Sequence, residues 1–274
     1  MSAVHVESVV GPVAPRGAVE FAHLFDRYAR RRLGTLDFAW AFEGFRAECL
    51  RVVAASGATS VCDVGGGWRP LFSLDDISRH GLDYTVLDVS PEALERTPAA
   101  YRTVCADICR PPRELRGSFD VVFSMFVAEH VRDGAAMHRN IFDMLRPGGV
   151  AVHVFPTLYH PAFVANKLLP EHLSQPLVQR LVRHSDKFPA RYSWCFGPTR
   201  SMHRRLRAIG YEVLEYRPFY GTYYLNGVPV LRSVEDGFSR WAARRRIPQL
   251  TSFARLQLRK PESWSPELRP ESRR

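Results

Sequence analysis

The sequence predicts an α/β fold, in which a parallel sheet is covered by helices on both faces. Two observations predict it. Short apolar segments of strand length alternate with segments of helical periodicity between residues 57 and 157, and this β-α-β order is typical of parallel sheets. The first apolar segment, residues 61–64, runs into three consecutive glycines, as a buried parallel strand does where it enters a tight turn.

The elements follow in chain order. Two helices are predicted ahead of the sheet, at residues 19–32 and 38–55, because large apolar residues recur there at helical spacing. The alternating region predicts strands at residues 60–64, 83–88, 101–105, 119–124 and 149–155, and helices at residues 75–80, 91–96 and 133–145. The remaining elements are a helix at residues 198–209, which Gly210 can cap, a strand at 211–217, a helix at 228–246 and a strand at 250–258.

These elements predict one domain over residues 19–262, with residues 19–56 as its N-terminal helices. After residue 156 the alternation breaks, and residues 157–197 are rich in proline. This segment predicts a helical insertion rather than a second domain. Residues 1–18 show no periodicity and are expected to be flexible, and residues 263–274 form a polar tail.

The composition is that of a globular protein, with 46% hydrophobic and 24% charged residues in a chain of 274. No apolar run approaches the roughly 18 residues that span a bilayer, and the first residues do not resemble a secretory signal. The five cysteines contain no C-x-x-C pair. Reduced, mostly buried thiols in a cytoplasmic protein are therefore expected.

The formal net charge of +10 suits an acidic partner, a nucleic acid or an anionic membrane. Arginine exceeds lysine throughout, and no aromatic-interleaved basic motif is present. No nucleic-acid partner is therefore expected. Residues 225–246 combine apolar positions with Arg240 and the run of arginines at 244–246. This pattern suits contact with a membrane surface or a lipid-like acceptor, but a solvated helix with a basic end is the favoured interpretation.

The turn formed by Gly65, Gly66 and Gly67 lets backbone N–H groups approach a ligand closely. It is not the dinucleotide-binding G-x-G-x-x-G, because Pro70 stands at the third glycine. No Gly-Lys-Ser/Thr follows, which excludes a P-loop. What remains is D-x-G-x-G, with Asp63 two residues before the first glycine. The alternative is a structural turn without a ligand.

Two further acids follow strands. Asp88 and Val89 end the next strand roughly 20 residues on, the spacing at which an acid accepts hydrogen bonds from a ribose diol. The alternative for Asp88 is a helix N-cap, a role that Ser90 fills better. Asp107 and Ile108 suit an adenine slot, with the acid accepting from the exocyclic amine and the isoleucine packing on the ring. The alternative for Asp107 is a plain loop carboxylate.

With the strand at 119–122, the turn Glu129-His130-Val131 and the motif at 145–149, these residues resemble a class I S-adenosylmethionine (SAM)-dependent methyltransferase of the small-molecule type. The resemblance covers residues 57–157 well and residues 203–261 more loosely. It implies a Rossmann-like, doubly wound, seven-stranded sheet with one antiparallel strand, SAM as cofactor and a small-molecule acceptor. The main departure is Arg69, which replaces the third glycine of D-x-G-x-G-x-G.

The resemblance also implies roles for single residues in cofactor binding. Gly65 and Gly67 would bound the methionine end of SAM, and Asp63 would orient their loop. Asp88 would hold the ribose. Asp107 and Ile108 would frame adenine, and Ser124 and Met125 would lie near the sulfonium. The residues expected to bind the cofactor are Asp63, Gly65, Gly66, Gly67, Asp88, Val89, Asp107, Ile108, Ser124 and Met125.

Methyl transfer needs orientation of the reactants and removal of the acceptor's proton. His130 and His160 lie just past strand ends on the expected ligand side and are the candidate bases; His130 can instead simply line the pocket. His80 and His138 are expected on helix surfaces. The aromatic stretches at 188–195 and 219–224 suit an acceptor pocket or, equally, packing of the insertion against the sheet.

Two other functions stay open at this point. One is a non-catalytic relative that binds SAM or a partner protein, because intact motifs do not prove turnover. The other is a nicotinamide-dependent oxidoreductase. Two observations count against it: Pro70 replaces the third glycine of the dinucleotide-binding motif, and the sequence has no Tyr-x-x-x-Lys pair. A metal site is not expected, since carboxylates and histidines do not cluster at ligand spacing.

Overall fold

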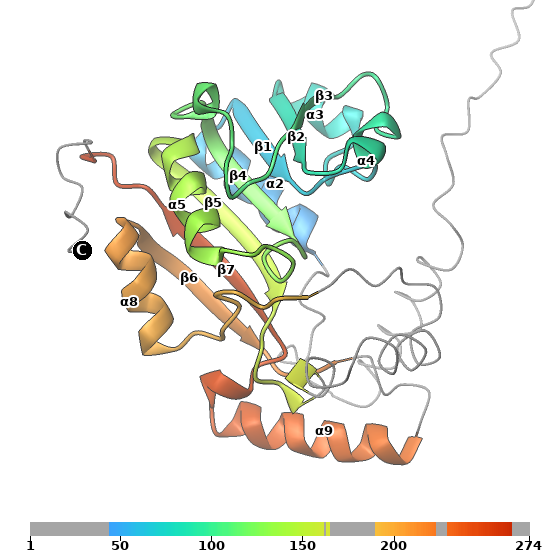
Figure 1. Ribbon diagram of the computed structural model, residues 1–274. Helices are drawn as coiled ribbons and strands as arrows, with labels where there is room; N and C mark the ends of the chain where they lie inside the picture. The colour runs from blue at the N-terminus through green and yellow to red at the C-terminus, as the bar shows by residue number, and fades with distance from the viewer. Residues whose placement is uncertain (1–43, 162, 165–189, 223–228, 265–274) are drawn as a thin grey trace, which may run out of the picture.

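The computed structural model describes residues 44–161, 163–164, 190–222 and 229–264 (Figure 1). The predicted helix at 19–32, the start of the helix at 38–55, most of the insertion and the end of the tail lie outside these residues. The elements, in chain order, are α2 (Phe45–Ser56), β1 (Ser60–Val64), α3 (Leu74–His80), β2 (Asp83–Asp88), α4 (Pro91–Glu95), β3 (Arg102–Cys105), η2 (Arg113–Leu115), β4 (Phe119–Met125), α5 (Gly134–Met144), β5 (Leu145–Pro156), α8 (Arg200–Ile209), β6 (Glu212–Phe219), α9 (Pro229–Arg244), η3 (Pro248–Leu250) and β7 (Phe253–Arg259).

The seven strands form one sheet in the order β3-β2-β1-β4-β5-β7-β6. Strands β1 to β5 pair in parallel, whereas β7 runs antiparallel to both of its neighbours, β5 and β6. The predicted α/β class and the implied seven-stranded sheet with one antiparallel strand are therefore confirmed. The order of the strands reverses between β1 and β4, because β2 and β3 are added on one side of β1, and β4 and β5 on the other. In doubly wound sheets, ligands bind at this point, beyond the carboxyl ends of the strands.

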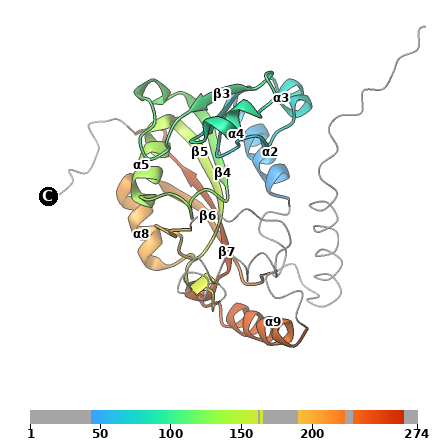
Figure 2. The ribbon, with the colours of Figure 1, turned by 45° about the vertical axis from the view of Figure 1, so that its right-hand side comes forward.

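Helices cover both faces of the sheet (Figure 2). Helix α2 packs against β4 and β5 on one face, and α5 and α8 pack on the other. Side chains fix several helix starts: Ser73, Ser90, Asp133 and Thr199 each accept a hydrogen bond from the backbone N–H three residues ahead. None of the helices within the described residues is both long and apolar enough to cross a bilayer.

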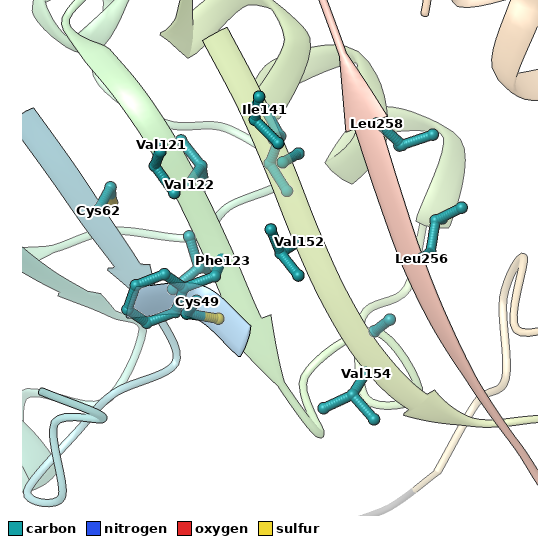
Figure 3. Packing of buried hydrophobic residues seen from close by; sticks show 14 of the residues in the cluster. Cys49, Cys62, Val121, Val122, Phe123, Ile141, Val152, Val154, Leu256 and Leu258 are labelled. Carbon is teal, nitrogen blue, oxygen red and sulfur yellow. The ribbon is translucent and has the colours of Figure 1, made fainter. Parts of the chain in front are cut away.

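The core lies between the sheet and these helices (Figure 3). Every residue of β1 is buried, as expected for a strand covered on both faces. On the α2 face, the ring of Phe72 lies 5.0 Å from that of Phe123 and 5.5 Å from that of Tyr84, between ring centroids. All five cysteines are free thiols, and Cys49, Cys62 and Cys195 are buried.

Two predicted boundaries are wrong by more than two residues, whereas the others within the described residues agree to within two. Strand β5 begins at Leu145 rather than at residue 149, because Leu145 already pairs with Phe119 before the register shifts and Val150 pairs with Val121. The turn motif at 146–149 is thus a bulge inside a strand. The last strand begins at Phe253 rather than at residue 250, because residues 248–250 form a 3₁₀ turn.

Candidate functional site

The glycine turn lies at the carboxyl end of β1 and can hold no side chain. Gly65 has a φ of +77°, and a Cβ added there would stand 2.2 Å from Cγ2 of Val127. Its N–H donates to the carbonyl of Leu87 over 2.7 Å, which ties the turn to β2. Gly67 also has a positive φ, +44°. The turn is therefore a backbone-lined cradle between β1, β2 and the loop after β4.

Asp63 lies beneath this cradle and is 3% exposed. Its carboxylate accepts hydrogen bonds from the N–H of Leu71 at 2.8 Å and from the hydroxyl of Tyr84 at 2.6 Å. A Cβ on Gly66 would stand 2.7 Å from Oδ2 of Asp63. Burial raises the pKa of Asp63 to about 6, although the two hydrogen bonds lower it. The acid thus braces the turn from below rather than facing a ligand.

Asp88 ends β2 beside the cradle and is half-buried. Its Oδ1 accepts from the N–H of Ser90 at 2.9 Å, and a Cβ on Gly67 would stand 3.1 Å from its Oδ2. Ser90 caps α4 by accepting from the N–H of Ala93. The N-cap role therefore belongs to Ser90, and the Asp88 carboxylate faces the glycine turn.

Asp107 and Ile108 follow β3 on the same edge of the sheet. Asp107 is exposed, and its Oδ1 accepts from the N–H of Cys109 at 2.8 Å. Ile108 is 4% exposed and packs in the core. A side chain that protein already covers offers little surface to an adenine ring, whereas Val89, 66% exposed, lies open at the end of β2. Of these two apolar residues, Val89 suits the packing role better.

Ser124 and Met125 end β4. The hydroxyl of Ser124 lies 2.9 Å from Nδ1 of His153 and is fully buried. This side chain points into the protein, so it can line a cofactor only through its backbone. Met125 is 38% exposed at the strand end.

Beyond β4, three distant segments meet. The carbonyl of Glu129 accepts from the N–H groups of Arg191 and Tyr192 at 2.6 and 3.0 Å. The N–H of Leu158 donates to the carbonyl of Cys195 at 2.8 Å. Residues 126–134, 157–158 and 190–197 therefore form one connected wall. Phe126, Tyr192 and Trp194 in this wall hold positive φ angles of 54–62°, which non-glycine residues adopt at a cost.

Glu129 and His130 form an acid–imidazole pair in this wall. Glu129 is 5% exposed, and its Oε1 lies 3.8 Å from Nε2 of His130. Its Oε2 is buried, and none of the described residues forms a hydrogen bond with it. Burial raises the pKa of Glu129 to about 8. Of the two, only His130 was predicted as a site residue; the acid directly before it in the sequence is the signal that points to the pair.

His160, the second predicted base, lies in aromatic packing. It is 1% exposed, and its ring centroid lies 5.7 Å from that of Phe163 and 5.9 Å from that of Phe238. Burial lowers its pKa to about 4. These surroundings favour packing over proton transfer, so the arrangement gives His130 the stronger case.

A buried histidine pair lies under the end of β4. The rings of His138 in α5 and His153 in β5 meet at 5.5 Å between centroids, and His138 lies 6.0 Å from Trp194. Burial lowers the pKa of His138 to about 4. Burial, together with the neighbouring His138, holds the pKa of His153 well below its ordinary value. The expectation of a surface position for His138 is wrong, because the apolar face of α5 carries it into the core; His80 is exposed as expected.

The two bulky residues that follow the glycines, Trp68 and Arg69, pack against each other. Trp68 is 39% exposed, with the guanidinium of Arg69 3.8 Å from its ring centroid and that of Arg96 4.3 Å from it. Arg69, which departs from the glycine of the motif, therefore packs on an aromatic ring at the rim. No cluster of three metal-ligating side chains occurs among the described residues.

Known proteins resemble this chain in sequence and in fold. A family model described as a methyltransferase domain matches residues 18–216. An uncharacterised methyltransferase of Mycobacterium sp. (strain KMS) is 37% identical over 99 residues, which cover 35% of this chain and 38% of that relative. The aligned stretch thus spans well under half the length of the curated relatives that come first.

Solved structures share the fold at low sequence identity. A SAM-dependent methyltransferase from Archaeoglobus fulgidus has a TM-score of 0.50, 13% identity, and coverage of 86% of this chain and 99% of that one. The geranyl diphosphate C-methyltransferase of Streptomyces coelicolor A3(2), solved with Mg²⁺, geranyl diphosphate and S-adenosyl-L-homocysteine, has a TM-score of 0.50 and 11% identity over 78% of this chain and 80% of that one.

Proposed function

Because this chain belongs to the methyltransferase-domain family, as its motifs predicted, we propose that it is an enzyme that transfers a methyl group from SAM to a small-molecule acceptor. One observation carries the proposal. The side-chain-free turn at Gly65–Gly67 faces the half-buried carboxylate of Asp88, and a Cβ on Gly67 would come within 3.1 Å of that carboxylate.

The described residues fit an adenosyl cofactor. The backbone cradle suits the methionine end, since only glycine leaves room between β1 and Val127. The Oδ2 of Asp88 suits a ribose hydroxyl, because none of the described residues donates a hydrogen bond to it. Val89 follows Asp88 directly and Asp107 follows the neighbouring strand β3, so both suit the adenine end of the cofactor. When bound, SAM supplies an electrophilic methyl group on a sulfonium.

The protein's own part in such a reaction is orientation and proton handling. We assign proton acceptance to His130, whose half-exposed imidazole can take a proton from the acceptor. Its Nε2 lies 3.8 Å from Oε1 of Glu129 in the wall after β4, so the acid is placed to orient the ring. The wall formed with residues 190–197 can shield this side from water.

The acceptor and the compartment belong to the proposal as well. A wall closed by buried aromatic and aliphatic side chains suits a small molecule. Nucleic acid is not part of the proposal, because the sequence has no basic motif interleaved with aromatic residues. Five free thiols support a cytoplasmic location.

Calorimetry tests the cofactor directly. We expect micromolar binding of SAM and S-adenosylhomocysteine, no binding of NADH, and a loss of at least 30-fold in affinity in Asp88→Ala, since ribose recognition rests on one carboxylate. Asp83→Ala is the matched control, because Asp83 is an exposed acid at the start of the same strand. Absence of binding of either adenosyl ligand to the wild type would overturn the proposal and leave a partner-binding relative.

A radiolabelled methyl-transfer screen then tests the acceptor class and the proton acceptor. With an acceptor found, His130→Ala should lower kcat at least 100-fold while S-adenosylhomocysteine affinity stays within twofold. Transfer to RNA or DNA alone would contradict the small-molecule class, and an unchanged kcat in His130→Ala would remove that residue from the mechanism.

A further inference from the structure

Helix α9 exposes an apolar stripe. Val230, Val234 and Trp241 are 74%, 67% and 48% exposed, and their spacing of four and seven residues places them on one face of the helix. Leu231, 49% exposed, widens the stripe. A helix of a globular protein ordinarily turns such a face inward.

The inward face of the same helix is polar. Arg232 is 2% exposed, with its Nε 2.9 Å from Oδ1 of Asp236 and an Nη 3.7 Å from Oε2 of Glu235. Arg232 also donates to the carbonyl of Thr222, and Thr222 donates to Glu235. These contacts fix the rotation of the helix, because turning the stripe inward would break buried ion pairs. The outward position of the stripe is therefore built into the fold.

The stripe is followed by positive charge. Arg244, in the last turn of α9, and Arg245 and Arg246, directly after it, are all exposed. The chain as a whole carries a formal charge of +10. Val, Leu and Trp on one face with arginines at its border is the side-chain pattern of helices that lie in the interface plane of an anionic bilayer.

We propose that the outward face of α9 docks on an anionic lipid bilayer, with Val230, Val234 and Trp241 entering the interface and Arg244 to Arg246 meeting the lipid phosphates. The face is a single convex helix surface rather than a groove, which suits a flat membrane. A second copy of this chain is the weaker partner, because it carries the same formal charge of +10, whereas an anionic bilayer carries the opposite charge.

The position of α9 makes the docking relevant to the site. Figure 1 shows α9 at the end of the molecule that the carboxyl ends of β4 and β5 approach. Phe238 of α9 contacts His160, which follows β5, at 5.9 Å between ring centroids. Docking through α9 would therefore bring the membrane to the side of the sheet where the cofactor cradle and the Glu129–His130 wall lie.

Vesicle co-sedimentation of the full chain tests this. Wild-type protein should sediment with vesicles of phosphatidylglycerol and phosphatidylcholine, and not with phosphatidylcholine alone. Val234→Asp/Trp241→Asp and Arg244→Glu/Arg245→Glu should each lower the apparent affinity at least tenfold. Leu214→Asp is the matched control and should bind as the wild type does, because Leu214 is an exposed apolar residue on β6. Circular dichroism and Tm establish that each variant folds.

Either of two results would overturn the proposal. One is failure of the wild type to bind anionic vesicles; a dimer in light scattering that Trp241→Asp abolishes would then assign the stripe to a second copy. The other is equal vesicle binding by Val234→Asp/Trp241→Asp and the wild type, which would show that the apolar stripe does not enter the bilayer and that binding rests on charge alone. The test is independent of methyl transfer, since cofactor binding is measured separately.

Discussion

The proposed cofactor side and the proposed acceptor side of this site are built in different ways. The cofactor side consists of consecutive strand ends within residues 63–108, and its shape comes from backbone and from glycines without side chains. The acceptor side joins residues 126–134, 157–158 and 190–197 through hydrogen bonds between segments far apart in the chain. A local motif can therefore describe the first, whereas only tertiary contacts define the second.

The two sides also treat charge differently. Asp88 and Asp107 on the cofactor side retain contact with solvent, although Asp63 beneath the turn is buried and its pKa is raised to about 6. On and next to the acceptor side, Glu129, His138 and His160 are all nearly or fully buried, and burial shifts each pKa in the direction that favours the neutral form. We therefore expect substitutions on the cofactor side to act through the shape of the glycine turn, and substitutions on the acceptor side to change how stability depends on pH.

The largest effect is expected from Gly65→Ala. The new Cβ would collide with Val127 in addition to holding a left-handed φ, so we expect a loss of about 3 kcal/mol or more in unfolding free energy and loss of S-adenosylhomocysteine binding. Gly117→Ala is the control, because Gly117 has a φ of +61° and no atom within 4 Å of its added Cβ. It should lose only about 1 kcal/mol of unfolding free energy and bind S-adenosylhomocysteine normally. Equal losses of stability in both variants would show that backbone strain, rather than the collision with Val127, causes the effect of Gly65→Ala.

Glu129→Gln should show an effect that grows with pH. Burial holds the pKa of Glu129 at about 8, above its ordinary 4.5, so the folded state binds more protons than the unfolded state between these values. Stability is thus lost as pH rises through this window. The variant, which cannot ionise, should gain Tm over the wild type at pH 9 and little at pH 4.5. A pH-independent difference would contradict the buried neutral acid.

His138→Leu should act in the opposite direction. Burial lowers the pKa of His138 to about 4 from its ordinary 6.5, so the unfolded state takes up the proton first and stability falls as pH drops from 6.5 to 4. Removing the imidazole should therefore raise Tm relative to the wild type at pH 5 more than at pH 7.5. Thermal melts at both pH values measure this, with His80→Leu as the exposed control.

The smallest effect is expected from Trp68→Leu, at the rim of the cofactor side. Loss of the ring between Arg69 and Arg96 should cost about 1 kcal/mol of loop stability and weaken S-adenosylhomocysteine binding only a few-fold. In a double-mutant cycle, Arg96→Gln should add little once Trp68 is gone. Additive losses would indicate that the arginine acts on the ligand independently of the ring.

Sequence reasoning reached far into the fold because its signals are local. The bounds of β1 and β2 were predicted residue for residue, since buried strands bounded by turns stand out in composition. The start of β5 was missed because pairing of Leu145 with Phe119 across the sheet outweighs the turn motif that follows. Residues whose surroundings come from distant segments, such as His138 and Glu129, could not be placed from sequence.

The order of strands in the sheet bears on how the chain is made. Among the described strands β6 pairs with β7 alone, and β7, the last of them in chain order, is inserted between β5 and β6. During synthesis on the ribosome, β6 therefore lacks its partner in this sheet until residues 253–259 have emerged. Five parallel strands can assemble first, and the nascent chain must keep β6 from aggregating until β7 follows.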